Sequence, residues 1–406
     1  MRCELHSFFR LANGKTIVRP RRSGKSALSA AGKIEIRATP NADVRLDARD
    51  APASISDQLH RSSLAIRRPS SEDVVIRKKK RAGMKLGRVS QQGIVFAIFL
   101  AMFAGFAFFL HGFATTANML ALLQNVAVLG ILGLGMAIVV IGRGVDLSLI
   151  ATLAVPPGLV LQMVQDGSSL SLALTAALLL SIAFGLVNGW LIAYAEVPAL
   201  FTTLATGLFL AGLGQALLFK LDVVQWSAGL AGFEKLGQGV VLGIPMPIIV
   251  FALACVVIGL LLTRTRVGAY IYAIGDNPFG ARTTGIPVRP TIVLQYVLAA
   301  LIGCLAGLVM AASVNSMPTR IYNSTWIYDV ILVVVLGGIG LSGGRGGVLN
   351  VVIGTLLIGT LLNGMTIMDI SYSAQNLIKG MVLLAAVIAD SFLNPRNEET
   401  AQQGDI

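Results

Sequence analysis

Cysteine and histidine are scarce in this chain of 406 residues, and their scarcity excludes several kinds of site. The three cysteines are scattered, and two of them fall within long apolar runs: Cys3, Cys255 and Cys304. An odd set of this kind predicts neither a disulfide framework nor a metal site. The three histidines are also far apart, and we find no convincing Ser/His/Asp triad or paired-carboxylate site. The sequence therefore predicts no catalytic residue, no metal and no cofactor.

Charged residues are also rare, at 13% of the chain, whereas average soluble domains carry about a quarter. Hydrophobic residues make up 55%, and the mean hydropathy is +0.77. Apolar runs of about 20 residues recur, which is typical of polytopic membrane proteins. Residues 1–88 hold 21 Lys and Arg against 8 Asp and Glu, whereas residues 89–406 hold 11 against 12, so the net charge of +12 belongs to the N-terminal part. We therefore divide the chain into a basic tail (1–88), a membrane body (89–395) and a short C-terminal tail (396–406), both tails being cytoplasmic.

The basic tail combines low hydrophobicity with high net charge, which predicts disorder. Its basic run, Arg77–Arg81, can bind anionic lipid or nucleic acid. A cytoplasmic anchor that follows the positive-inside rule is the favoured interpretation, and we expect no nucleic-acid partner. Met84 opens a second plausible start, in which case residues 1–83 are not translated. The tail is not a secretory signal peptide, because its apolar segment begins only at Gly93.

Ten apolar spans predict an all-α polytopic membrane protein with some broken helices. The eighth span is short and rich in glycine, so we expect a broken or partly inserted helix there. In the fourth span, Gly185 and Gly189 have a spacing that favours packing within the chain over a dimer face. The spans are residues 93–112, 119–141, 147–164, 170–195, 199–219, 244–263, 291–313, 327–341, 348–365 and 376–392.

The distribution of Lys and Arg predicts that both termini are cytoplasmic. With the N-terminus inside, three basic residues fall in external loops: Lys220, Lys235 and Arg320. Lys379 lies in the last span. Seven fall inside: Arg143, Arg264, Arg266, Arg282, Arg289, Arg345 and Arg396.

Two glycine-rich segments interrupt the spans. In Gly142–Ser148, Asp146 lies near Ser148, and non-helical backbone at this depth is tolerated only against protein or a water-filled path. Two roles remain open for Asp146: it lines or hinges that path, or it is the N-cap of the third helix. Leu336–Gly347 echoes the first segment, which weakly indicates an internal repeat. Other polar residues in or near spans either fasten helices or contact solute: Asn188, Asp329 and Asn363.

The stretch Ala273–Val288 is a polar loop, rich in Gly and Pro, between two apolar runs. With its flanking arginines it forms a segment, residues 264–290, that predicts a docking site for a separate motor. Pro278 suits the first turn of a short helix around Asn277–Thr284. The chain has no Gly-x-x-x-x-Gly-Lys-Ser/Thr phosphate loop, so any ATP motor must be another chain. For the same reason we reject Leu341–Arg345, which resembles the signature segment of ABC ATPases, as a nucleotide site.

Together these motifs resemble the permease subunit of monosaccharide ABC importers of the ribose/xylose/galactose type, over about residues 89–394. Gly142–Ser148 is similar to that family's Gly-Gly-Ile-Asp-Leu-Ser segment, with Arg143 where a second glycine is common. Asp329 and Gly337–Gly347 are similar to its late aspartate and glycine-rich run. The fourth and fifth spans resemble its pattern at Gly185, Asn188, Gly189, Pro198, Phe201, Thr203 and Leu204. The family's cytoplasmic loop resembles Gly275, Asn277, Ala281, Arg282, Gly285 and Ile286, although Pro278 and Phe279 depart from it.

The resemblance implies a non-enzymatic subunit in a bacterial inner membrane. It would pass a monosaccharide from a periplasmic binding protein to the cytoplasm by alternating access, driven by separate ATPase subunits. Two permease chains, expected as a homodimer, would form the pathway. The ATPase contact falls on Gly275, Asn277, Ala281, Arg282, Gly285 and Ile286, with Arg282 facing an acidic residue of the motor. We expect a weakly polar substrate path near Asp146, Ser148, Asn188 and Asp329.

Three alternatives are weighed against this reading. The first is a nucleoside or branched-chain amino-acid ABC permease, which would show a similar pattern of spans and motifs. An ion-coupled secondary transporter would need buried carboxylates paired within the bundle and no motor dock. A membrane scaffold without transport is disfavoured by the polar breaks within the spans.

Overall fold

The computed structural model describes residues 33–37, 43–47, 91–219 and 221–393, which belong to two units, 1–88 and 89–406, each described by itself. In the first unit, β1 (Lys33–Arg37) and β2 (Asp43–Asp47) pair antiparallel, a pairing that the expectation of disorder did not include. The rest of the tail, with its basic run and Met84, lies outside the described residues, as does the C-terminal tail from 396. Disorder there and the second start stay predictions.

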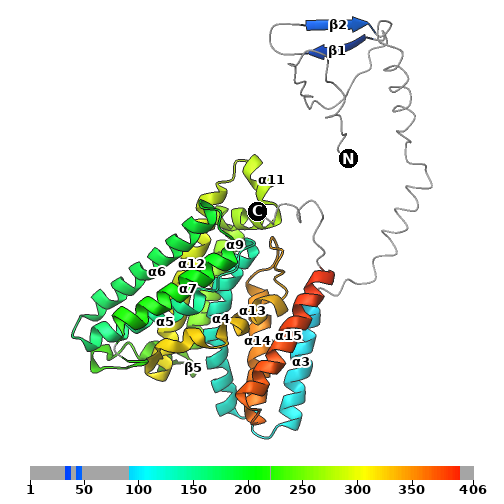
Figure 1. Cartoon of the computed structure of the whole chain (residues 1–406). Coiled ribbons are helices and arrows are strands. Elements are labelled where there is room, and N and C mark those ends of the chain that lie inside the picture. Colours follow the sequence, from blue (N-terminus) through cyan, green and yellow to red (C-terminus); the bar gives the residue numbers. More distant parts are fainter. Residues whose placement is uncertain (1–32, 38–42, 48–90, 220, 394–406) are drawn as a thin grey trace. The chain divides into compact units, whose positions relative to one another are not determined.

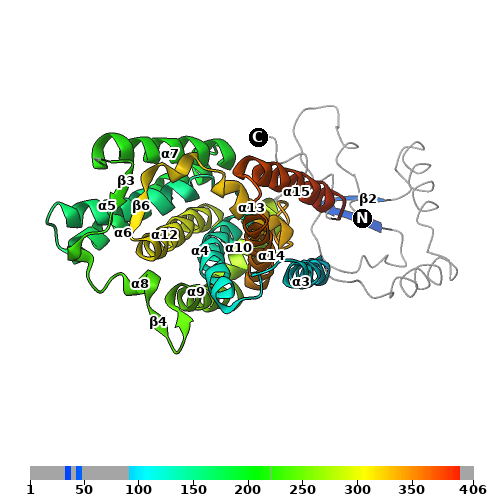
Figure 2. The same ribbon diagram turned by 90° about the horizontal axis from the view of Figure 1, so that it is seen from below.

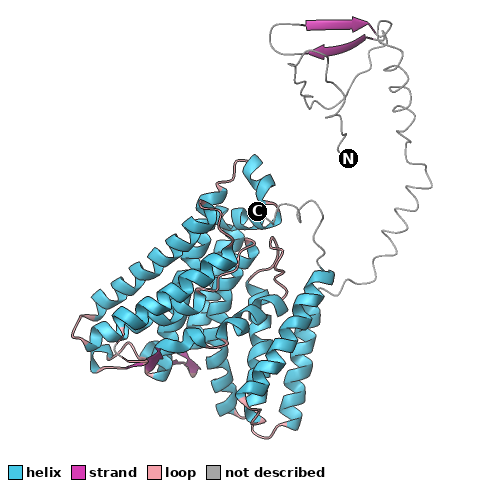
Figure 3. Ribbon diagram, viewed as in Figure 1, coloured by secondary structure: helices cyan, strands magenta, loops and turns pink. Residues whose placement is uncertain are grey.

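The membrane unit is almost entirely helical, and each of the ten expected spans corresponds to a helix (Figure 3). Seven helices among the described residues are long and apolar enough to cross a membrane. They are α3 (Gln91–Phe109), α4 (Thr116–Ile141), α6 (Leu170–Ala193), α7 (Ala199–Leu213), which continues as the π-helical turn η1 (Gly214–Leu218), α9 (Met246–Arg264), α12 (Val288–Val314) and α14 (Val348–Ile367).

Three apolar helices are shorter: α5 (Leu149–Gln165), α13 (Trp326–Leu336) and the apolar part of α15 (Tyr372–Leu393). The 11 residues of α13 give about 16 Å at 1.5 Å per residue, roughly half of a 30 Å hydrocarbon core. The expectation of a short eighth helix is confirmed. It ends because Gly337 and Gly338 follow, and Gly338 has a φ of +92°, which glycine adopts without strain.

Helices α4 and α12 form the centre of the bundle (Figure 2). Every residue of α4 from Val126 to Ile141 is buried, as expected for a helix that is apolar on all sides. Helix α12 packs most extensively against α6. At Gly185 and Gly189 of α6, an added Cβ would overlap the backbone of α12 at Val297 and Val293. The Gly-x-x-x-Gly pair is thus a packing contact within the chain, as the sequence indicated.

One end of the unit carries short strands and turns. These are β3 (Val223–Gln225), η2 (Ala228–Leu230), α8 (Lys235–Gln238), β4 (Val240–Val241), β5 (Ile244–Pro245), β6 (Ser316–Pro318) and η3 (Thr319–Asn323). Strand β3 pairs antiparallel with β6, and β4 pairs with β5. An exposed ion pair joins Arg320 to Asp222 at 2.7 Å.

The opposite end carries α10 (Arg266–Asp276), α11 (Pro278–Thr283) and both glycine-rich breaks (Figure 1). Helix α3 begins at this end, because Gln92 donates to Asn350 at the start of α14 across 2.7 Å. Helix α15 starts at the other end, where Tyr372 and Asn376 hydrogen-bond to Thr325. The end of α15 therefore lies at the α11 end, as does the start of α3.

Candidate functional site

The break between α4 and α5 packs closely against α12. Gly142 is the C-cap of α4, and α5 begins only at Leu149. An added Cβ at Gly142 would overlap the side chain of Gln295, and one at Gly144 would overlap Tyr296. A side chain at either position would have to displace the end of a side chain of α12, so the two glycines allow α12 to pack closely here.

Asp146 closes a turn ahead of α5. Its Oδ1 accepts from the backbone N–H of Ser148 at 2.9 Å and from the Ser148 hydroxyl at 2.5 Å. The N-cap position of α5 belongs to Ser148, so the interpretation of Asp146 as the N-cap is wrong. A carboxylate that binds the N–H two residues later forms an Asx turn instead. Asp146 and Ser148 are both fully buried.

This turn is fastened to two neighbouring helices. Asn188 of α6 donates to the Ser148 hydroxyl at 2.8 Å, and it accepts from the hydroxyl of Thr206 on α7. Thr203 of α7 accepts from the backbone N–H of Leu147 at 3.0 Å. Three of the four expected path residues thus lie in one network: Asp146, Ser148 and Asn188. We name these three residues, with Thr203 and Thr206, the sealed network.

The sealed network has no room for solute in this conformation, because its five side chains are all buried. It closes the break against α6 and α7. Thr206 was missed from the sequence. The available signal was the spacing of Thr202 and Thr206, one helical turn apart on the face of α7 that is buried.

Asp329, the fourth expected path residue, lies elsewhere. Lys379 of α15 contacts its Oδ1 at 2.9 Å and its Oδ2 at 3.1 Å, and it also donates to Thr325 at 3.3 Å. Both charged side chains are only 7% exposed. Lys379 points inward while its neighbours Leu377 and Met381 are exposed, so α15 presents one apolar face and one that carries this charge.

The ion pair borders a partly open cavity of about 500 Å³ between α4, α12, α13, α14 and α15. Its polar lining includes Gln124 and Asn125 of α4, Asn363 of α14 and Gln375 of α15. Asn363 is already paired, since it exchanges two hydrogen bonds of 2.9 Å with Asn118. Asn363 therefore acts at least as a fastener between α4 and α14. Gln124 and Asn125 were missed because neither belongs to a motif.

The two glycine-rich breaks meet beneath α10. Gly344 N–H donates to the carbonyl of Ile141 at 2.8 Å, and Arg143 Nε donates to the carbonyl of Ser342 at 3.0 Å. Tyr272 of α10 donates to the carbonyl of Gly346 at 2.7 Å, and burial raises the pKa of this phenol, which keeps it protonated. An added Cβ on Gly275 would overlap both Ile141 and Gly344. We name these contacts the junction.

The short helix expected around Asn277–Thr284 is present as α11. The Asn277 side chain caps it by accepting from Gly280 N–H at 2.8 Å, and Pro278 lies in its first turn. It ends at Thr283, and Gly285, two residues later, has a φ of +82°. Ala281 is buried against Ile274 and Val288, which fixes α11 to α10 and α12.

The six expected coupling residues divide by exposure. Gly275 and Ala281 are buried, and Ile286 is partly buried, so they hold α11 in place. Asn277, Arg282 and Gly285 are exposed, and Phe279, which was not among the six, is 58% exposed. The exposed surface of α11 is therefore Phe279, Arg282 and Thr283, with Asn277 at one end and Thr284 and Gly285 at the other.

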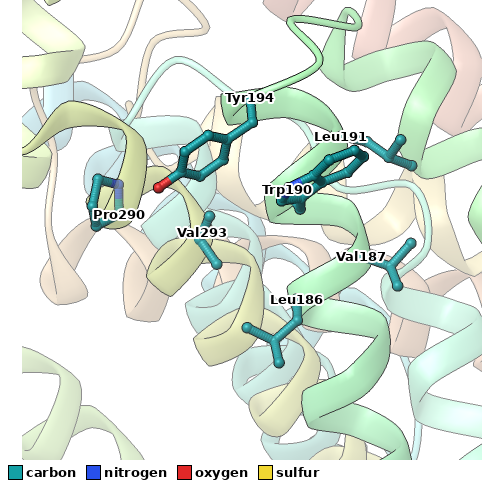
Figure 4. Close-up of a pocket in the computed structure, with 7 residues that line it drawn as sticks. All are labelled: Leu186, Val187, Trp190, Leu191, Tyr194, Pro290 and Val293. Atoms are coloured by element: carbon teal, nitrogen blue, oxygen red, sulfur yellow. The ribbon is translucent and has the colours of Figure 1, made fainter.

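An apolar groove of about 730 Å³ lies between α6 and α12 (Figure 4). Its lining is Leu186, Val187, Trp190, Leu191, Tyr194, Pro290 and Val293. Tyr194 also receives the Arg289 guanidinium at 5.5 Å from its ring centre, and Arg289 pairs with Glu196 at 3.1 Å. An apolar outer face of a membrane helix contacts lipid, so this groove is no candidate for a polar solute.

Residues 118–387 match the family described as branched-chain amino acid transport system / permease component. The chain is 37% identical over 274 residues to the ribose import permease protein RbsC of Bacillus subtilis, covering 67% of this chain and 84% of that protein. It is 33% identical over 283 residues to RbsC of Escherichia coli K12, covering 69% and 87%. It is 34% identical over 313 residues to the L-arabinose transport system permease protein AraH of the same strain, covering 77% and 94%. No solved structure matches the chain.

Proposed function

Because this chain belongs to the permease family of binding-protein-dependent ABC importers, we propose that it carries a monosaccharide across a bacterial inner membrane. The relatives named for ribose and arabinose support a pentose as the first substrate to test. The polytopic helical architecture agrees with the permease role, and the chain, which has no phosphate loop, leaves ATP hydrolysis to a separate subunit.

The observation that carries the proposal is α11. A six-residue helix, capped by Asn277, exposes Phe279 and Arg282 at one end of the bundle. It is anchored by Ala281 and joined through α10 to the junction of the two breaks. A partner that moves α11 would therefore move the backbone beside the sealed network. Such a link between an exposed helix and the interior suits a permease driven by an external ATPase.

Orientation follows from α11 as well. The start of α3, the end of α15 and α11 lie at one end (Figure 1). Five arginines belong to the segments there: Arg264 ends α9, Arg266 begins α10, Arg282 lies in α11, Arg289 lies in the first turn of α12, and Arg345 lies in the second glycine-rich break. Lys235 and Arg320 lie in the loops at the other end. With the α11 end in the cytoplasm, the positive-inside rule is obeyed and both termini are inside. The strand-bearing end then faces the periplasm and the sugar-binding protein. As a separate part of the proposal, two permease chains form a homodimer.

The proposal is tested by transport in proteoliposomes that contain the permease with its ATPase and its binding protein. Labelled ribose, arabinose and leucine are compared, with and without ATP inside the compartment that the α11 end faces. We expect ATP-dependent uptake of a pentose and none of leucine. Uptake of leucine alone would support the second candidate, a branched-chain amino-acid permease, which the family description favours. Uptake without ATP that a proton ionophore abolishes would contradict both.

A further inference from the structure

The cavity bordered by Asp329 and Lys379 has two amide side chains on its wall that await a partner. Gln124 and Asn125 lie on its α4 wall, and within the described residues neither side chain makes a hydrogen bond. Asn125 is nine residues beyond the start of α4, about 14 Å at 1.5 Å per residue, so it lies deep in the bilayer region. Amides at this depth are costly unless they face water or a polar ligand.

The lining of the cavity matches a polyol. Sugar hydroxyls both donate and accept hydrogen bonds, and each amide offers a carbonyl oxygen and two N–H groups. Opposite the amides, Asp329 supplies acceptors and Lys379 supplies donors, held together by their own contacts. Trp326 of α13 adds an aromatic surface for the C–H face of a sugar ring. The volume, about 500 Å³, falls in the usual range for small-molecule sites.

The position of the cavity also agrees with a site that meets a solute arriving from the strand-bearing end. Thr325 and Tyr372, which line it, lie at the end where α15 begins, opposite α11. Helices α13, α14 and α15 stand beside α4 when the unit is seen from that side (Figure 2). The cavity therefore lies nearer to the strand-bearing end than the sealed network does.

We propose that this cavity is the site where the permease receives the imported sugar, with the amides of Gln124 and Asn125 and the Asp329–Lys379 pair as its hydrogen-bonding groups. The inference rests on the proposed function and deepens it, because it names the part of the chain that meets the substrate. It assigns the sealed network to closure of the path and the cavity to contact with the sugar.

The test uses Gln124→Leu and Asn125→Leu in the complete reconstituted complex with labelled ribose and arabinose. Leucine has the branched shape and the same number of side-chain heavy atoms as asparagine, and one fewer than glutamine, and it removes the hydrogen bonds. We expect each variant to lower sugar uptake about tenfold, the size of losing one hydrogen bond to a neutral group. ATPase stimulation by the binding protein should persist. Thr175→Val is the matched control, since it removes an exposed hydroxyl of α6 that bonds only to Ser171 of its own helix outside the cavity, and it should keep uptake within about twofold.

The outcomes separate the two proposals. ATP-dependent uptake by the unaltered complex together with normal uptake by both leucine variants would overturn the site and leave the proposed function standing. Loss of both uptake and stimulated ATPase in the two variants would assign these amides to folding or coupling, and would also overturn the site. No ATP-dependent sugar uptake by the unaltered complex would overturn the proposed function and the site with it.

Discussion

The membrane unit has two polar clusters that differ in whether their side-chain amides are paired. In the sealed network near the α11 end, the Asn188 amide joins Ser148 to Thr206, and both are buried, although Asp146 Oδ2 has no hydrogen-bond partner among the described residues. At the other end, Asp329 and Lys379 satisfy each other, but the amides across the cavity from them remain unpaired within the described residues. Paired groups fix helices, whereas unpaired groups beside a cavity are available to a ligand.

The difference also separates what the two clusters do when the subunit changes conformation. The sealed network holds the break against α6 and α7, and the junction links that break to α10 and α11. Under the proposal that α11 receives the motor's movement, a shift of α11 would act on the junction and then on the sealed network. The cavity lies at the strand-bearing end, away from α11. We therefore propose a gate near α11 and a separate solute site at the other end.

Lys379→Met should have the largest effect on stability, because it leaves the buried Asp329 carboxylate without its partner. Removal of one member of a buried pair costs about 3–5 kcal/mol. The double variant Lys379→Met with Asp329→Asn should recover most of that loss, since no charge stays buried. Unfolding midpoints in detergent measure both. Equal losses in the single and double variants would show that the pair is not what holds α13 to α15.

Gly189→Ala should have the next largest effect, since the new methyl group would overlap Val293 on the backbone of α12. Overpacking of this kind costs about 1–3 kcal/mol, and it would push Asn188 away from Ser148. Gly212→Ala is the control, because an added Cβ there meets no atom within 4 Å. Unfolding midpoints of the two variants should therefore move in opposite directions or differ clearly. Equal behaviour would contradict the close packing of α6 on α12.

Thr206→Val should have the smallest effect of the three. It removes the hydroxyl that donates to Asn188 and leaves a buried acceptor without its partner, at a cost of about 1 kcal/mol. Thr263→Val is the control, because that hydroxyl is exposed and bonds only to Gly259 of its own helix. If Thr263→Val lowered the unfolding midpoint as much as Thr206→Val does, the hydroxyl groups of the sealed network would contribute no more to stability than an exposed hydroxyl group.

Most of the fold could be predicted from the sequence, because hydrocarbon runs of 18 or more residues have few alternatives to a membrane helix. The sequence predicted the ten spans, the short α13, the packing of Gly185 and Gly189 within the chain, and α11 with Pro278 in its first turn. The partner helix of the two glycines, α12, was not predicted. The sequence could not predict which residues of α11 are buried and which are exposed. Motif matching cannot separate Ala281, which is buried, from Phe279, which is exposed, because both lie in the same six residues.

The candidate site was predicted only in part. Asp146, Ser148 and Asn188 do come together, but Asp329 belongs to a different cluster, since its partner Lys379 is 50 residues away on α15. Sequence proximity gives no measure of such a contact. Gln124 and Asn125 belong to no motif, and only the cavity beside them identifies them as candidate site residues. Pairing and burial of polar groups depend on tertiary packing, which the pattern of hydrophobicity does not specify.

The most direct test of the account is Arg282→Glu in the reconstituted complex. Arg282 is exposed on α11, so the variant should stay folded with an unchanged unfolding midpoint, which Arg320→Glu can match as a control at the opposite end. We predict that Arg282→Glu abolishes sugar uptake and removes the link between the binding protein and the ATPase rate. Uptake and stimulated ATPase equal to those of the unaltered complex would contradict the claim that α11 transmits the motor's movement.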